Sequence, residues 1–187
     1  MERRGQRDAT RSQGTVGPGE LRASGARVGL RPVTAEDEHF LFAVYASTRA
    51  DELALLDWDE GQKAAFVQMQ FTAQDRYYHE HYADAAFQII LNDGVPVGRL
   101  YVGRWPAEIR IVDIALLPEY RGGGVGTRLL RDLLSEAGQD GKVVTIHVER
   151  FNPALGWYQR LGFKPIEDRG VYLLMRWSAD DQVKTAS

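Results

Sequence analysis

The chain has 187 residues, of which 44% are hydrophobic, 26% charged and 10% aromatic. This length fits one domain whose core is large enough to need neither a metal nor a disulfide. A formal net charge of −3 and an isoelectric point of about 5.8 argue against nucleic-acid binding by the whole molecule. Because the chain has no cysteine, thiolate catalysis, disulfides and cysteine-ligated metal sites are excluded.

The composition of the chain shifts near residue 27. Residues 1–26 hold five glycines, no aromatic residue and five arginines, namely Arg3, Arg4, Arg7, Arg11 and Arg22. Such a segment predicts a flexible basic tail, with contact to nucleic acid as the weaker alternative. We therefore expect a folded domain over residues 27–178 and a C-terminal tail over 179–187. With no secretory signal and no membrane-length apolar run, we expect a cytoplasmic protein.

The first half of the domain predicts both strands and helices. A strand is expected at 28–33, followed by a helix that Thr34 and Asp37 open as a capping box. A second helix is expected at 60–82, with Phe66, Met69, Gln70 and Ala73 along one stripe. The turn Asn92-Asp93-Gly94 joins strands at 87–91 and 95–102, and 108–117 is a further strand.

The second half continues the alternation. A helix with a leucine stripe is expected at 124–138, a strand at 143–149, a helix at 152–161 closed by Gly162, and a final hairpin to residue 177. The order strand, helix, strand between 108 and 149 predicts a parallel pair, whereas the flanking hairpins predict antiparallel neighbours. The expected class is α+β, with a mixed sheet between helical layers.

Four glycines at one helix start are the most informative feature. Gly122, Gly123, Gly124 and Gly126 lie between an expected strand and an expected helix. Glycine disfavours helix by about 1 kcal/mol relative to alanine, so such a cluster needs a reason. Bare backbone amides at a helix N-terminus bind anions well. A mobile glycine loop is the alternative.

Common nucleotide motifs do not match this cluster. A P-loop needs a lysine after its last glycine, and the dinucleotide fingerprint needs a glycine at Thr127. His79 and His81 do not form a metal pair, because two residues apart on a helix they point to different faces. No metal site is expected.

The residues around the cluster resemble the GNAT N-acetyltransferase superfamily. Arg121-x-x-Gly124-x-Gly126, preceded by residues 113–120, is similar to the family's pyrophosphate-binding motif. A second similar motif covers 152–163, and residues 30–37 and 93–98 resemble the family's first strand and hairpin. The resemblance spans residues 27–178 and implies a centrally splayed sheet flanked by helices, the acyl-CoA N-acyltransferase fold.

The resemblance also implies acetyl-CoA as the cofactor. The amides of 122–127 would hold its pyrophosphate, and the strand backbone near Leu116 would hold the pantetheine and polarise the thioester carbonyl. The residues that the resemblance implicates in cofactor binding are Ile114, Leu116, Arg121, Gly122, Gly123, Gly124, Val125, Gly126, Thr127 and Asn152. Core packing for Ile114 and Leu116, and helix capping for Asn152, are the structural alternatives.

Three residues are the catalytic candidates. Tyr158 matches the family's tyrosine that protonates the leaving thiolate, although it also suits a packing role. His147 lies where some relatives carry a proton acceptor, and its pKa near ~6.5 suits that task. Asp113 and Glu108 are rivals, acting directly or through water. Deprotonation without a dedicated base is a further alternative.

The expected function is transfer of an acetyl group from acetyl-CoA to a primary amine, directly in a ternary complex. The amine belongs to a small molecule, a peptide N-terminus or a lysine. A homodimer is one possible assembly of the chain. Acidic and aromatic residues in the first third of the chain favour a cationic acceptor. The alternative is that they form a solvated helix face and part of the core. These residues are Asp51, Glu52, Asp57, Asp59, Glu60, Trp58, Phe66, Tyr77, Tyr78 and Tyr82. A catalytically silent acyl-CoA sensor is the rival function.

Overall fold

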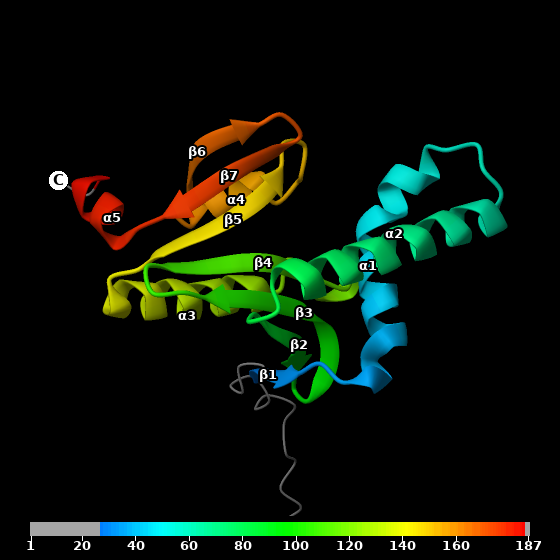
Figure 1. Ribbon diagram of the computed structural model, residues 1–187, viewed down its shortest axis with the longest axis horizontal. Coiled ribbons are helices and arrows are strands. Elements are labelled where there is room, and N and C mark those ends of the chain that lie inside the picture. Colours follow the sequence, from blue (N-terminus) through cyan, green and yellow to red (C-terminus); the bar gives the residue numbers. More distant parts are fainter. Residues whose placement is uncertain (1–26, 186–187) are drawn as a thin grey trace, which may run out of the picture.

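The computed structural model describes residues 27–185, so the expected basic tail at 1–26 lies outside the described residues. The strands are β1 (Val28–Pro32), β2 (Ala86–Asn92), β3 (Val95–Arg104), β4 (Glu108–Leu116), β5 (Val143–Glu149), β6 (Lys164–Arg169) and β7 (Tyr172–Trp177). The α-helices are α1 (Glu38–Ala54), α2 (Glu60–His81), α3 (Val125–Asp140), α4 (Leu155–Arg160) and α5 (Ala179–Thr185). Helix α5 occupies most of the expected C-terminal tail (Figure 1).

The strands form one mixed sheet in the order β1-β2-β3-β4-β5-β7-β6. Strands β4 and β5 are parallel, as predicted, and all other neighbours are antiparallel. The parallel pairing begins at Glu108 and Val143 and ends at Ile111 and Ile146. Beyond that point the two strands separate, so the sheet is splayed at its centre (Figure 1).

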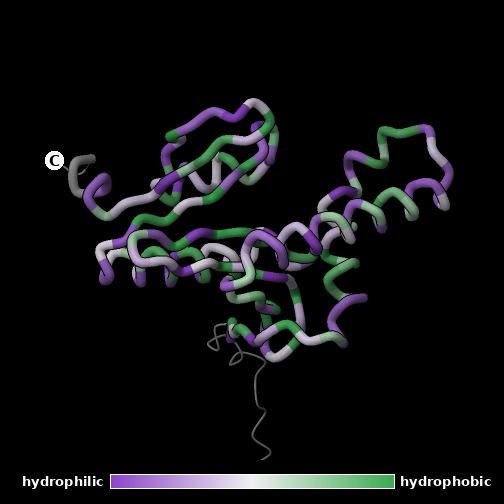
Figure 2. The backbone as a smooth tube through the Cα atoms, viewed as in Figure 1, coloured by the Kyte–Doolittle hydropathy of each residue, from purple (hydrophilic) through white to green (hydrophobic). Residues whose placement is uncertain are grey.

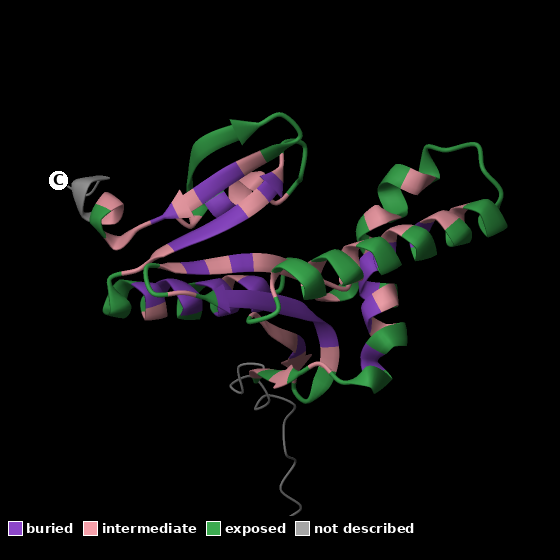
Figure 3. Ribbon diagram, in the orientation of Figure 1, coloured by how far each residue is buried: buried purple, intermediate pink, exposed green. Residues whose placement is uncertain are grey.

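Helices cover both faces of the sheet, which confirms the three-layer arrangement. On one face α3 buries its predicted stripe against β3, β4 and β5, and Tyr158 of α4 joins this core. On the other face α1 and α2 pack over Ile89 and Tyr101. The hydrophobic and buried positions follow the central strands, whereas edge strand β6 is exposed throughout (Figures 2 and 3).

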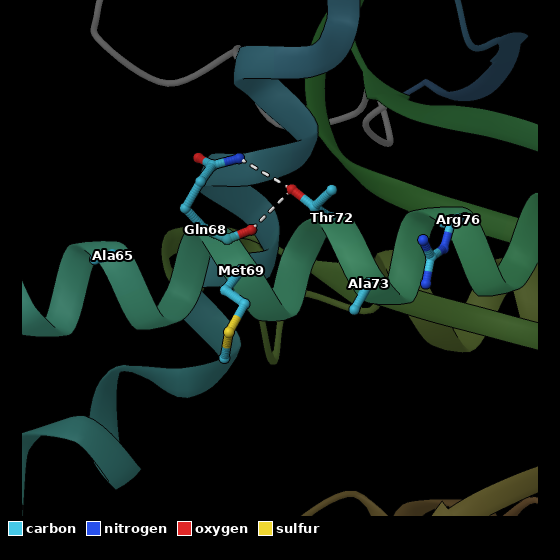
Figure 4. Close-up of a pocket in the computed structure, with 6 residues that line it drawn as sticks. All are labelled: Ala65, Gln68, Met69, Thr72, Ala73 and Arg76. Carbon is cyan, nitrogen blue, oxygen red and sulfur yellow. Dashed lines mark hydrogen bonds between the residues drawn. The ribbon is translucent and has the colours of Figure 1, made fainter.

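The buried face of α2 differs from the predicted one. Val67 and Phe71 are the buried residues of this helix, whereas Met69 is 61% exposed. The sequence carries a second stripe, Val67, Phe71, Gln74 and Tyr78, at the same helical spacing, and this stripe faces α1 and the sheet. Of the predicted stripe, Met69 and Ala73 lie on an open surface groove with Ala65, Gln68, Thr72 and Arg76 (Figure 4). Phe66 instead packs against Trp58, and Gln70 accepts a hydrogen bond from the hydroxyl of Tyr45.

Local sequence signals set several helix ends. Thr34 and Asp37 form the predicted capping box, and Asp37 also lies 2.6 Å from Arg31 in an ion pair. The hydrogen bond from Arg31 holds the pKa of Asp37 well below its usual range. Gly162 closes α4 in the left-handed conformation, with φ 93°. Helix α4 starts later than predicted, because Asn152 Oδ1 accepts from the amide of Ala154 and forms a turn instead of the N-cap.

Candidate active site

A cavity of about 1030 Å³ lies where β4 and β5 separate. Its walls are the ends of these strands, the glycine loop with the start of α3, helix α4 and the side of α1. All three catalytic candidates, Asp113, His147 and Tyr158, line it. Every residue expected to bind the cofactor also lines it, apart from Gly123. The structure thus brings together side chains that lie far apart in the sequence.

The glycine loop presents bare backbone to this cavity. Gly122 and Gly124 adopt left-handed φ values of +74° and +87°, and a Cβ at either position would meet nothing within 4 Å. Gly124 caps α3 without a side-chain hydrogen bond. The amides of Val125, Gly126 and Thr127 follow in the first turn, where no intrahelical acceptor exists. This cradle of amides beside open space fits a phosphate-bearing group.

Trp157 packs against the same helix start. A Cβ on Gly126 would lie 3.3 Å from two ring atoms of Trp157, so any larger residue here would push the ring away by a few tenths of an ångström. The indole Nε1 donates a hydrogen bond to Thr127 Oγ1 at 3.0 Å. The sequence reasoning missed Trp157, whose signal is a tryptophan next to the candidate Tyr158.

Arg121 serves the loop through its side chain. Its Nε donates to the carbonyl of Leu116 at 2.8 Å, and its Nη2 donates to Ser47 Oγ at 3.0 Å. These bonds tie the glycine loop to the end of β4 and to α1. The guanidinium therefore supports the cradle by contacts within the protein.

Tyr158 is the most deeply placed of the catalytic candidates. Its side chain is 5% exposed and packs against the rings of Trp157 and Phe163. Burial raises the pKa of the Tyr158 phenol, and the negative charge of Asp113 raises it further. The hydroxyl is therefore protonated at neutral pH, the form that a proton donor needs.

Asp113 faces α1 and α2 because of a bulge in β4. Tyr101 pairs with Asp113 and Val102 with Ile111, which leaves Val112 as the extra residue. Asp113 Oδ2 lies 2.6 Å from Nη2 of Arg99, whose side chain is only 4% exposed. Burial opposes the charge of Arg99, but Asp113 together with Tyr101 and Tyr78 outweighs burial, and the pKa of Arg99 is raised. Asp113 is thus held in an ion pair with a buried arginine, and its carboxylate compensates the charge of that arginine.

His147 and Glu149 share one face of β5 and line the cavity. Burial and the nearby charge of Arg110 lower the pKa of His147, so its ring is neutral at pH 7. His147 Nδ1 lies 3.4 Å from Arg110 Nη1. A guanidinium only donates, so Nδ1 is assigned as the acceptor and Nε2 as the protonated nitrogen. This contact weighs against His147 as a base.

The rival Glu108 is held outside the cavity. It forms an ion pair with Arg110 at 2.7 Å and accepts a hydrogen bond from the hydroxyl of Thr145. The cavity lining starts farther along β4, at Val112. The structure does not bring Glu108 to the other candidates.

The acceptor side of the cavity contains only part of the expected acidic and aromatic set. Asp51, Glu52 and Tyr78 line it. The expected residues that do not line it are Asp57, Asp59, Glu60, Trp58, Phe66, Tyr77 and Tyr82. Lining residues that were not predicted include Tyr45, Arg49, Gln74, Arg99, Glu149 and Tyr172. Of these, Arg99 carried a signal, a charge in the middle of an apolar strand.

The described residues lack two further features. No group of three or more histidine or acidic side chains within residues 27–185 is placed to hold a metal ion. Over the same residues, no helix combines the length and the apolar character that crossing a membrane requires.

Comparisons with known proteins place this fold and cavity in a class. The model of the acetyltransferase (GNAT) family matches residues 36–163. In its fold, the chain resembles the PaiA N-acetyltransferase of Thermoplasma acidophilum, solved in complex with coenzyme A. The TM-score is 0.62 at 18% identity, over 81% of this chain and 99% of that one.

Two curated relatives are similar in sequence. One is a Bacillus subtilis protein whose name proposes it as a ribosomal protein bS18 alanine N-acetyltransferase. It is 31% identical over 117 residues, which are 56% of this chain and 76% of the relative. The other is the N-alpha-acetyltransferase RimI of Mycobacterium tuberculosis, 38% identical over 96 residues, which are 50% of this chain and 58% of that protein.

The chain therefore belongs to the acetyltransferase (GNAT) family. It is an acyltransferase of the acyl-CoA-dependent class, and acetyl-CoA is the cofactor that goes with this family.

Proposed function

We propose that the protein transfers an acetyl group from acetyl-CoA to a primary amine, directly, within a complex of enzyme and both substrates. The observation that carries this proposal is the single cavity that joins the open glycine cradle, Tyr158 and the polar face of β5. With no cysteine in the chain, a cysteinyl acyl-enzyme has no place in the reaction.

The cavity offers binding groups for both the pyrophosphate and the pantetheine of the cofactor. The amides of Gly122–Thr127 bind the pyrophosphate at the start of α3. Pairing with β5 stops at Ile111, so β4 has a free edge over Val112–Leu116. This edge offers backbone groups to the extended, amide-bearing pantetheine, as it would to an added strand. The Asn152 turn lines the same cavity near α4.

The reaction requires two proton transfers, one from the amine nitrogen and one to the departing thiolate. Acetyl-CoA supplies the thioester, whose carbonyl carbon the neutral amine nitrogen attacks. A C–N bond forms and the C–S bond breaks. The face of β5 with His147 and Glu149 takes the proton that the nitrogen loses, and Tyr158 gives its phenolic proton to the departing thiolate. Asp113 lines the same cavity, and its carboxylate is paired with the buried guanidinium of Arg99.

The names of the curated relatives suggest the kind of amine, since both describe the acetylation of α-amino groups. We therefore propose an α-amine as the acceptor. The test is a panel of amino acids, peptides, polyamines and amino sugars with acetyl-CoA, followed by thiol release. We expect turnover with α-amines. Coenzyme A binding without turnover on any amine would favour a silent acyl-CoA sensor.

A further inference from the structure

Two arginines flank one tyrosine on the acceptor side of the cavity. The guanidinium of Arg49, from α1, lies 5.6 Å from the centre of the Tyr45 ring. The guanidinium of Arg99, from β3, lies 5.8 Å from the same point. All three residues line the cavity, so two positive charges gather where the amine must enter.

Both guanidinium groups keep unused donors. Nη2 of Arg99 lies 2.6 Å from Asp113 Oδ2 and donates a hydrogen bond to Gln74 at 2.8 Å. Arg49 contacts Glu52 at 3.2 Å and Glu149 at 3.5 Å through its two terminal nitrogens. The Nε of each is buried and has no hydrogen-bond partner within the described part of the chain. A guanidinium has five N–H donors, so each retains capacity for a ligand.

The carboxylates on this side are mostly neutralised. Glu52, Glu149 and Asp113 each lie in an ion pair with one of the two arginines. A polyamine carries several positive charges and needs several unpaired carboxylates. The acidic cleft expected from the sequence is therefore a cleft of balanced charge, and it does not suit a polycation.

We propose that the acceptor carries a carboxylate close to its amine, and that Arg49 and Arg99 bind this carboxylate. Arginine suits the task because its planar fork matches a carboxylate in charge and geometry. The inference rests on the proposed acetyltransferase function and specifies its substrate. Two sources share this chemistry: a free amino acid, and the N-terminus of a peptide with an acidic residue.

The experiment compares acceptors that differ only in the carboxylate. Glycine is paired with glycinamide, and the peptide amide Ala-Glu with Ala-Gln, using the full chain and acetyl-CoA. The enzymes are the wild type, Arg49→Gln and the control Arg76→Gln. Arg76 lies outside the cavity on α2, with its side chain 77% exposed, and loses the same charge. Arg99 is left intact, because its burial makes a folding defect the first consequence of replacing it.

We expect wild type and Arg76→Gln to prefer the carboxylate member of at least one pair by about tenfold or more in kcat/KM. The preferred pair identifies the source. Arg49→Gln should lose this preference, and the loss should show chiefly as a higher KM for the carboxylate member. Equal use of both members by the wild type, or a preference that survives in Arg49→Gln, would overturn the inference alone. If no amine were acetylated, the proposed function itself would be overturned.

Discussion

The indole of Trp157 donates a hydrogen bond to the hydroxyl of Thr127 at 3.0 Å, while its ring packs over Gly126. This contact joins α4, which carries the proposed proton donor, to the helix start that carries the proposed phosphate cradle. The two halves of the splayed sheet are thereby fixed to each other beside the cavity. Thr127 thus has two roles, a backbone amide toward the cofactor and a side chain toward α4.

Replacing Thr127 separates these roles. Thr127→Val keeps the shape and the amide but removes the acceptor of the Trp157 hydrogen bond, whereas Thr127→Ser keeps the hydroxyl. We expect Thr127→Val to lower kcat several-fold with little change in coenzyme A affinity, and Thr127→Ser to restore it. Steady-state kinetics and calorimetric titration measure the two quantities. Equal kcat in all three proteins would show that Trp157 does not position Tyr158.

Gly124→Glu tests the cradle. The substitution puts a carboxylate at the helix start that we assign to the pyrophosphate, so coenzyme A binding should be abolished. The matched control is Gly141→Glu at the other end of α3. Gly141 also has a left-handed φ, of +63°, and open space around its Cβ position. Both variants bear a similar backbone strain of about 1–2 kcal/mol, so only Gly124→Glu should lose binding. Unchanged affinity in Gly124→Glu would refute the assigned site.

Tyr158→Phe tests proton donation. The ring still fills its buried place in the core, but the phenolic proton is gone. We expect kcat to fall about a hundredfold while the coenzyme A dissociation constant stays within twofold. Tyr77→Phe, on α2 outside the cavity lining, is the control and should behave as wild type. A wild-type rate in Tyr158→Phe would make Tyr158 a packing residue.

The pH dependence of kcat/KM identifies the proton acceptor. The pKa of His147 lies below its ordinary value of 6.5, so the neutral form, which can accept a proton, predominates above pH 6.5. If His147 accepts the proton, kcat/KM falls as the pH drops through this lowered pKa, and His147→Gln removes the fall. We expect no such fall from His147 in the wild type, because Arg110 faces its Nδ1. His147→Gln should therefore keep the wild-type profile of kcat/KM, whereas Glu149→Gln should lower kcat. A wild-type kcat in both variants would mean that solvent takes the proton.

Sequence reasoning succeeded where the signal is local. The capping box at Thr34, the leucine stripe of α3 and the glycine that ends α4 each depend on a few neighbouring residues, and the structure contains all three. The parallel strand pair followed from element order, because a helix between two strands requires a crossover. The position of the glycine cluster at the start of α3 was also predictable from local sequence, whereas its binding of pyrophosphate stays a prediction.

What the sequence did not reveal depends on contacts between distant residues. The bulge at Val112 lets Ile111 and Ile114, three residues apart, face the same core, and it turns Asp113 toward Arg99. Neither strand alone encodes that register. The pairing of Arg49 with Glu149 joins residues 100 positions apart, so the charge balance of the acceptor side becomes visible only in the fold.

The most direct test of the proposed function is the joint detection of both products. Purified protein is incubated with acetyl-CoA and an α-amine, and mass spectrometry follows the acetylated amine while a thiol reagent follows free coenzyme A. We predict that the two products appear in equal amounts, and that Gly124→Glu forms neither. Release of coenzyme A without an acetylated amine, or tight coenzyme A binding with no product from any amine, would contradict the assignment as an amine acetyltransferase.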